Sequence, residues 1–481
     1  MFKWLRRRTM VAMIISKALL MTVIAPILIF SMANISYQQL ELPFDDNREA
    51  IEEEGEEAIE EEGEEAIEEE GEEAACIDYE AEENTIALSC NASFLDVVQA
   101  INDPEILEQE EEDGQYILNA NLEVSDGITF KMNSSGDNLQ YLKISGENGI
   151  IVQGRIEISG IKITSWDTET DSPVSQTATG SVPRAFINLR GSEGGIIEDS
   201  EISHLGYSEP RRRGFDLFGG GPSHDIEIRG SEFHDMWMAF YSNGAYNITI
   251  DGNEFYDNIL YAIDPHTGTH NMTVSNNKIY NNNGIGVICS WDCYDIIFER
   301  NEVYNNVRSG LMLSRATHDS TIRNNIIHNQ YETAYPISIS ESQNNEIHGN
   351  NITNSTFGIS VHNPVELDED GMSTDNRIYN NTFNGVQNAI RASASSDNIF
   401  SNNLFGNVTD FHYTMTSDAS MDIENQIFDM VNARGFSGDN TLSIRNSGKI
   451  IIDNTIEHDT ALEPYTEVLS DQSVKIDSAR E

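Results

Sequence analysis

Short apolar runs, broken by Asn, Gly and Asp, return along this chain at a fixed period. The pattern apolar-x-x-Asn-x-apolar occurs at Asn253, Asn277, Asn301 and Asn325, each 24 residues after the last. Looser copies are centred on Ile161, Ser200, Ser231, Asn350, Asn381 and Asn402. Periods of about 20 to 50 residues are typical of solenoids, and β-branched runs between turn residues indicate strands. The pattern predicts an all-β fold, a parallel β-solenoid of roughly ten coils with three short strands per coil.

The recurring Asn residues are predicted to be structural. An Asn at the same corner of every coil tolerates left-handed backbone angles and can donate its amide to the Asn of the next coil. Aligning the coils on these residues turns Ile263 and Pro265 inward, and Asp264 and His266 outward. A carboxylate and an imidazole are therefore expected on one exposed face, separated by about 7 Å along the strand. Such a pair is suited to acid–base chemistry.

The composition changes sharply outside the repeat. Residues 1–33 join a basic start to an apolar run, which predicts a signal peptide or an N-terminal membrane anchor. Residues 34–75 hold a Glu-rich repeat with a period of eight residues and are expected to be a disordered linker. Residues 76–150 should form an N-terminal cap and the start of the solenoid, 151–410 the β-helix with the catalytic face, and 411–481 a C-terminal cap and tail. The folded part is expected outside the cytoplasm. It would be either secreted or held at the outer face of the cytoplasmic membrane, and residues 1–33 would be its only contact with the membrane.

The charge balance restricts the partners. The chain has 28 Lys and Arg against 81 Asp and Glu, a net charge of −53, which argues against nucleic acid and anionic lipid. An anionic substrate would need a local basic patch. Arg211, Arg212 and Arg213 form such a cluster in the segment 207–222, which lengthens one coil and is expected on the face of His266. They would act as an anion clamp or as a solvated loop paired with the surrounding acids. We expect a monomer.

The four cysteines suggest an oxidising compartment. Local disulfides are predicted between Cys76 and Cys90 and between Cys289 and Cys293. The second pair, with nearby His residues, does not have a standard zinc spacing, so no metal site is expected. Several Asn-x-Ser/Thr sequences, including those at Asn91, Asn133, Asn247, Asn271 and Asn407, predict glycosylation sites.

The runs Phe233–Tyr241 and Asp257–His266 resemble the catalytic region of the bacterial periplasmic mannuronan C5-epimerases, whose signature is Asp-Pro-His-Asp. The resemblance extends from about His204 to Ile327. It implies a right-handed parallel β-helix. It also implies C5 epimerisation of uronate residues within an anionic polysaccharide such as alginate, converting β-D-mannuronate into α-L-guluronate.

The resemblance also assigns residues. His266 matches the general base, while Asp264 and Tyr261 match neighbours tied to activity; Pro265 fixes the backbone between the two polar groups. Strict alternation would turn Tyr261 inward unless a corner intervenes. Tyr241, in the first of the two runs, is expected to contact substrate.

Two positions depart from the pattern of these epimerases. Thr267 stands where the signature ends in Asp, and Trp291 stands where an Arg neutralises the substrate carboxylate. Arg315 lies in the same column one coil further on, about 9.6 Å from Thr267 at a coil spacing near 4.8 Å. The cationic group is therefore expected from Arg315 or from the Arg211 to Arg213 cluster. Trp291 would be a stacking platform for a sugar ring or a shielding aromatic on the surface.

Three functions compete. A C5-epimerase is favoured; a polysaccharide lyase acting by β-elimination begins with removal of the same C5 proton, and a non-catalytic glycan-binding solenoid at the cell surface is the third. No redox cofactor is required, because a proton is exchanged and no hydride moves. Calcium is left open as a ligand.

Overall fold

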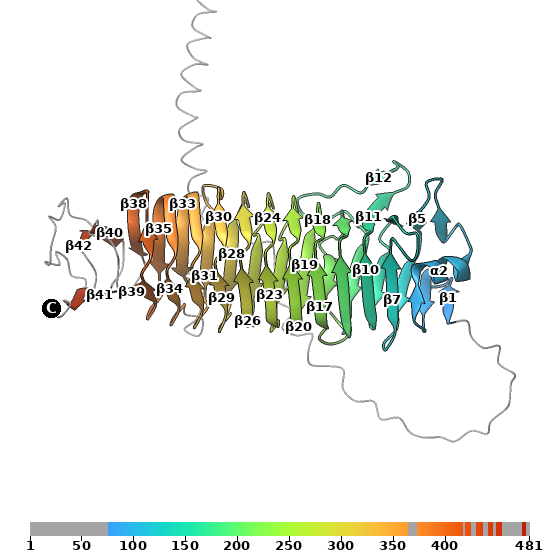
Figure 1. Ribbon diagram of the computed structural model, residues 1–481, viewed down its shortest axis with the longest axis horizontal. Coiled ribbons are helices and arrows are strands. Elements are labelled where there is room, and N and C mark those ends of the chain that lie inside the picture. Colours follow the sequence, from blue (N-terminus) through green and yellow to red (C-terminus); the bar gives the residue numbers. More distant parts are fainter. Residues whose placement is uncertain are drawn as a thin grey trace, which may run out of the picture. The chain divides into compact units, whose positions relative to one another are not determined.

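The computed structural model describes residues 76–363, 373–416 and 419–424, and the strands at 430–435, 441–445, 449–454 and 474–477. The segments predicted as signal or anchor and as linker lie outside the described residues. Short strands follow one another in a parallel β-helix of about twelve turns, coloured in chain order in Figure 1. The predicted all-β solenoid is thereby confirmed.

Each central coil contains three strands, as predicted. One coil holds β20 (Tyr246–Asp251), β21 (Glu254–Tyr256) and β22 (Ile263–His266), and the next two hold β23 (His270–Ser275), β24 (Lys278–Tyr280), β25 (Val287–Ser290), β26 (Tyr294–Glu299), β27 (Glu302–Tyr304) and β28 (Ser309–Ser314). Each strand pairs in parallel with its counterpart 24 residues further along. Ile263, Val287 and Leu311 form the inward column that the repeat predicts.

The other strands extend this arrangement in both directions. Those before it are β1 (Ile77–Glu80), β2 (Thr85–Leu88), β3 (Ala92–Ser93), β4 (Leu107–Gln109), β5 (Gln115–Leu118), β6 (Asn121–Val124), β7 (Thr129–Asn133), β8 (Tyr141–Ser145), β9 (Gly149–Val152), β10 (Arg155–Ser159), β11 (Lys162–Asp167), β12 (Ser172–Pro173), β13 (Phe186–Leu189), β14 (Gly194–Glu198), β15 (Glu201–Ser203), β16 (Gly214–Leu217), β17 (His224–Arg229), β18 (Glu232–His234) and β19 (Met238–Asn243). Those after it are β29 (Thr321–Arg323), β30 (Ile326–His328), β31 (Tyr335–Ser340), β32 (Glu346–His348), β33 (Asn351–His362), β34 (Arg377–Tyr379), β35 (Thr382–Ser393), β36 (Ile399–Ser401), β37 (Leu404–Phe405), β38 (Val408–Thr416), β39 (Ser420–Glu424), β40 (Met430–Gly435), β41 (Thr441–Arg445), β42 (Lys449–Asn454) and β43 (Val474–Asp477). Parallel pairing continues through β38 to β43, past the point where the sequence repeat fades.

The predicted Asn ladder runs through the buried side of one corner. Asn253 donates its Nδ2 hydrogen to Asn277 Oδ1 at 3.0 Å, and the link repeats from Asn277 to Asn301 and from Asn301 to Asn325. The expectation of left-handed angles at these residues was wrong. The preceding residue takes that conformation instead, at Asn276 (φ 56°) for example, because the ladder Asn must point its amide inward from the start of a strand.

A second buried ladder was not predicted. Asn258, Asn282 and Asn306 repeat the same amide contacts at the next corner, where Asn258 donates to Asn282 Oδ1 at 2.9 Å and Asn282 donates to Asn306 Oδ1 at 2.9 Å. Gln330 continues this ladder by accepting from the backbone N–H of Asn306. This second ladder fixes the turn that leads into β22.

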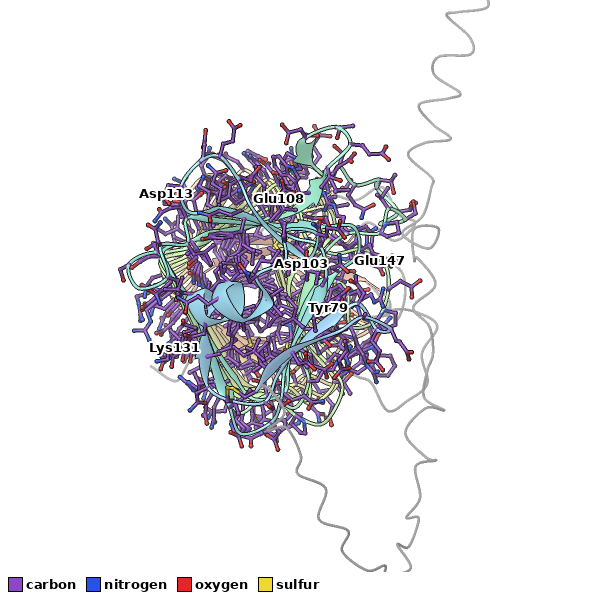
Figure 2. All side chains as sticks on the ribbon, turned by 90° about the vertical axis from the view of Figure 1, so that its right-hand side faces the viewer. Tyr79, Asp103, Glu108, Asp113, Lys131 and Glu147 are labelled. Atoms are coloured by element: carbon purple, nitrogen blue, oxygen red, sulfur yellow. A yellow bond between two sulfur atoms is a disulfide. The ribbon has the colours of Figure 1, made fainter. Side chains whose placement is uncertain are left out.

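The helix α2 (Phe94–Ile101) lies across the N-terminal end of the β-helix (Figure 2). Ser93 caps it, with its hydroxyl accepting from the Asp96 N–H, and Asp96 accepts in return from the Ser93 N–H. Phe94 and Val97 are fully buried against the first coils. The helix therefore covers apolar side chains that an open solenoid end would expose. Within the described residues, no helix has the length and apolar character needed to cross a membrane.

The two predicted disulfides have opposite outcomes. Cys76 and Cys90 are bonded, as predicted, beside the β1–β2 hairpin. The predicted Cys289–Cys293 bond was wrong, because both thiols are free and buried. Cys289 points inward in the same column as Leu313, and the Cys293 thiol donates to the Ser290 and Pro265 carbonyls. The two thiols lie close enough for Cys293 to hydrogen-bond Cys289, but they are not covalently joined.

Candidate active site

Strand β22 places Asp264 and His266 on the outer side of the β-helix, as the alternation predicts. His266 is partly buried, but Asp264 is only 1% exposed, so the expectation of a fully exposed face was wrong for Asp264. The burial comes from a layer of side chains packed outside the coil, an apolar cluster that includes Trp237, Tyr241 and Tyr261. These residues lie outside the central core. Tyr241 pairs with Asp264 from the adjacent coil, and Tyr261 is close enough for the Asp264 charge to act on its phenol.

Tyr261 belongs to this outer cluster and is 4% exposed. It does not point inward, because the chain turns between β21 and β22 and the strand alternation begins only at Ile263. The segment 207–222 contributes to the same face. Its central part is the strand β16, which pairs in parallel with β19. In this register Asp216 lies beside Tyr241, and Tyr241 lies beside Asp264 of β22 in the next coil. The lengthened coil thus reaches His266's side of the β-helix, as predicted.

His266 is held by its immediate neighbours in the structure. Its Nδ1 lies 2.5 Å from the Thr267 hydroxyl, and its carbonyl accepts from the Thr269 hydroxyl at 2.7 Å. The Tyr241 and Trp291 rings flank the imidazole, with ring centres 5.7 and 6.5 Å away. A hydrogen bond from Nδ1 to Thr267 would leave Nε2 with a free lone pair. The exposed Thr267 and the buried Pro265 therefore fix both the backbone and the ring at this position.

The arginines of the predicted cluster separate. Arg213 extends to the site, with its guanidinium 4.1 Å from the centre of the Tyr241 ring and Nη1 3.4 Å from Asp216 Oδ2. Arg212 pairs instead with Glu147 at 2.9 Å and with the Tyr207 hydroxyl at 2.6 Å. The Arg211 guanidinium lies over Phe218. Of the three, Arg213 is thus the one that the structure brings to His266.

Arg315 approaches from the opposite side. Its guanidinium carbon lies 4.9 Å from the centre of the Trp291 ring, so the side chain crosses back over the intervening coil. Burial, together with the positive charges of Arg213 and Arg315, lowers the pKa of His266 to about 3. The two arginines therefore both act on the imidazole, one from each flank. The sequence had left these two sources as alternatives, and the structure brings both to the site.

Two buried carboxyl groups lie beneath the arginines. Burial raises the pKa of Asp264 well above its usual value, although Arg213 and Arg315 oppose the shift. Burial also raises the pKa of Asp216 to about 6, opposed by Arg213. In each group, Oδ1 has no hydrogen-bond partner within the part of the chain that the structure describes. Burial therefore favours the neutral form of the Asp264 carboxyl, which can donate a hydrogen bond.

The phenols at the site are also protonated. Burial raises the pKa of Tyr261 to about 12, with the Asp264 charge adding to the shift and Arg308 and Arg315 opposing it. Burial likewise raises the pKa of Tyr241. The site thus combines an unprotonated imidazole, a buried carboxyl whose pKa is raised, two phenols and two guanidinium groups. This set can remove a proton, return one and neutralise an anion.

Sequence reasoning missed four polar residues near this set. Asn243 pairs with His266 one coil away and lies 3.5 Å from the Tyr241 hydroxyl. Asp216 lies beneath Arg213, and Arg308 acts on the Tyr261 phenol. Arg190 is partly buried and follows β13, in line with His266 but in a coil nearer the N-terminus. The 24-residue alignment did not locate Asn243, Asp216 or Arg190, because the coils before Asn253 have other lengths.

Comparisons with known proteins agree with this description. A family model described as a right-handed β-helix region matches residues 217–366. The crystal structure of the periplasmic alginate epimerase AlgG is similar in fold, with a TM-score of 0.53 and 20% sequence identity over 82% of this chain and 85% of that chain.

Two curated relatives match a shorter part of the chain. The mannuronan C5-epimerase AlgG of Azotobacter vinelandii is 25% identical over 164 residues, which is 32% of this chain and 30% of that protein. The mannuronan C5-epimerase of Pseudomonas fluorescens is 28% identical over 138 residues, or 26% of each protein. The match thus spans less than a third of the relatives' length. The resemblance to mannuronan C5-epimerases seen in the sequence is confirmed by these matches.

Proposed function

We propose that this chain is a C5-epimerase acting on uronate residues within an anionic polysaccharide of the mannuronan type. The observation that carries the proposal is the position of His266, an unprotonated imidazole flanked by Arg213 and Arg315. The named relatives support the same reaction, since they are mannuronan C5-epimerases. The acidic chain is expected to bind an anionic polymer only where such a local positive field exists.

His266 is assigned as the base that removes the C5 proton. The C5–H bond breaks, its electron pair moves toward the adjacent carboxylate, and the proton passes to Nε2 of the imidazole. Arg213 and Arg315 stabilise the negative charge that grows on that carboxylate. Asp264 is assigned as a further hydrogen-bond donor at this point, because burial favours its neutral form, which adds no negative charge to repel the substrate.

A second group must return a proton to the opposite face of C5. Tyr261 is assigned to this step, because its raised pKa keeps the phenol protonated and it lies in the layer that covers Asp264. Tyr241 and Trp291 would contact the sugar rings, since both flank the imidazole. One proton leaves and one arrives, so the reaction needs no redox cofactor. Calcium binding is not part of this mechanism.

The decisive experiment is incubation with polymannuronate in deuterated water, followed by NMR. We expect deuterium at C5 and the appearance of guluronate with the wild-type protein, and neither with His266→Ala. His270→Ala is the matched control, because His270 stacks between Tyr246 and Tyr294 on another strand column and should leave turnover unchanged.

Other products would assign a different reaction. Unsaturated sugar ends absorbing in the ultraviolet would identify a lyase, in which the C4 oxygen leaves after the same proton abstraction. Binding without deuterium exchange or product, tested over several polyuronates, would refute both enzyme assignments. We further propose that the protein acts outside the cytoplasm as a monomer, in keeping with the Cys76–Cys90 disulfide.

A further inference from the structure

Two histidines and an aspartate lie together at a corner of the β-helix that the proposed reaction does not use. Nitrogen and oxygen atoms of His204, His234 and Asp235 all lie within 4.8 Å of one another. His234 Nδ1 is 2.8 Å from Asp235 Oδ2, and His234 Nε2 is 3.5 Å from Glu201 Oε1. All three residues of the cluster are partly buried. They follow or end the strands β15 and β18, which pair in adjacent coils.

The cluster interrupts a regular column of the fold. His204, Asp235, Asp257, Asn281 and Asn305 occupy equivalent corner positions in successive coils, and each has a left-handed backbone with φ between 54° and 58°. Further along, this column forms an amide ladder, in which Asn305 donates to Asn281 Oδ1 at 3.2 Å. Asn281 in turn hydrogen-bonds the Asp257 carboxylate. A carboxylate only accepts hydrogen bonds, so the ladder ends at Asp257 and does not pass on to Asp235. Burial and the charge of Asp235 raise the pKa of Asp257.

His204 has an unused ligand atom. Its Nδ1 is buried and has no hydrogen-bond partner within residues 76–363, where its surroundings lie. An imidazole nitrogen that makes no hydrogen bond can offer its lone pair to a metal ion. The nearby Arg184 donates to the carbonyls of Val174 and Asp235, at 2.9 and 2.8 Å. Its guanidinium hydrogen-bonds these backbone oxygens, and its charge also attracts the Asp235 carboxylate.

We propose that His204, His234 and Asp235 bind a divalent transition-metal ion of the zinc class. Two imidazoles and one carboxylate are a ligand set that Zn²⁺ takes in proteins, with bonds of about 2.0 to 2.2 Å and a fourth position for water or another ligand. Glu201 is placed to fill or support that position. Small side-chain rotations bring the three ligand atoms to the spacing of a tetrahedral site. The ion would link two adjacent coils, in place of the amide ladder, and the proposal does not depend on the epimerase assignment.

The test uses the full chain without a polyhistidine tag, stripped with chelator and dialysed. Zn²⁺ binding is measured by calorimetry and by metal analysis, and Co²⁺ is added for its visible absorption. We expect one ion per chain, and a rise in melting temperature when Zn²⁺ is present. His204→Asn and His234→Tyr should each weaken binding at least tenfold. Both substitutions introduce a residue type found in the same column, Asn281 three coils from His204 and Tyr256 in the coil next to His234, so that folding is preserved.

His328→Tyr is the matched control, because His328 ends the same stack of rings and faces Glu302, but has no second histidine beside it. It should bind Zn²⁺ like the wild type. The proposal is overturned if the wild type binds neither Zn²⁺ nor Co²⁺ at 1:1 stoichiometry. It is equally overturned if His204→Asn and His234→Tyr, both folded by circular dichroism, bind as well as the control.

Discussion

At the scale of single residues, the environment of His266 differs from that of an exposed histidine. Its pKa is lowered to about 3 by burial and by two arginines. Because this pKa is lowered, the imidazole is unprotonated at every pH above about 3 and can act as a base there. The free-enzyme profile of kcat/KM should therefore show no acid limb near pH 6.5, the value of an ordinary histidine.

That profile is measured between pH 4.5 and 8 on polymannuronate. The Asp216 carboxyl, whose pKa is raised to about 6 by burial, is the group at the site that titrates in this range. Any inflection near pH 6 should consequently disappear in Asp216→Asn. An acid limb near pH 6.5 that persists in this variant would mean that His266 is far more solvated than the structure shows.

Arg213 and Arg315 offer a second test at this scale. Lysine keeps the charge but loses the planar fork of donors, so Arg213→Lys and Arg315→Lys should each reduce kcat and kcat/KM about 100-fold. Equal loss in both constants is expected, because the charge on the substrate carboxylate develops in the transition state. Arg323→Lys, which alters an ion pair with Glu299 elsewhere on the β-helix, is the control. A change in KM alone would assign the two arginines to substrate binding only.

The alternation of the repeat places Asp264 and His266 on the correct side of the strand from sequence alone. It could not predict the burial of Asp264, because Tyr241, which pairs with Asp264, comes from another coil. It could not separate Arg213 from Arg212 either. That difference depends on Glu147, a residue 65 positions away along the chain, which pairs with Arg212.

At the scale of the repeating element, the Asn ladder carries a measurable share of stability. Asn277 accepts two hydrogen bonds from Asn253 and donates to Asn301 and to the Ile250 carbonyl. Asn277→Ala would leave the buried N–H groups of Asn253 without an acceptor. The free energy of unfolding should fall by roughly 2–4 kcal/mol, measured by urea denaturation.

The control for this substitution is Asn351→Ala, because the Asn351 side chain is exposed at the start of β33. It should change stability by less than about 0.5 kcal/mol. Equal effects of the two substitutions would show that the ladder contributes nothing beyond backbone pairing. The period of the sequence was sufficient to predict this ladder. The period could not predict that the left-handed residue is the one before each ladder Asn, because this depends on side-chain direction at the corner. It also could not predict that Cys289 and Cys293 stay unbonded, because this depends on side-chain direction in the core.

At the scale of the whole molecule, the net charge of −53 opposes folding by self-repulsion. Salt should therefore stabilise the protein, and the melting temperature should rise by a few degrees between 20 and 500 mM KCl at pH 7.5. Exposed ion pairs between coils, such as Lys131 with Glu157, oppose this trend but contribute only about 0 to 1 kcal/mol each.

The same scan near pH 4.3, the isoelectric point of the sequence, is the control, since little net charge is left to screen there. A melting temperature that falls with salt at pH 7.5 would show that local ion pairs outweigh the overall repulsion. The fold class of the molecule followed from its period, whereas the strands beyond residue 408 pair in parallel without a repeat that the sequence displays.

The equal coil length between Asn253 and Asn325 also has a mechanical meaning. Each of these coils is bonded only to the one before and the one after, with partners 24 residues apart. Under tension applied at the two ends, the β-helix should unzip coil by coil. Each step would release 24 residues, or about 80 Å of extended chain at roughly 3.3 to 3.6 Å per residue. The central region would then give evenly spaced rips in a force–extension trace.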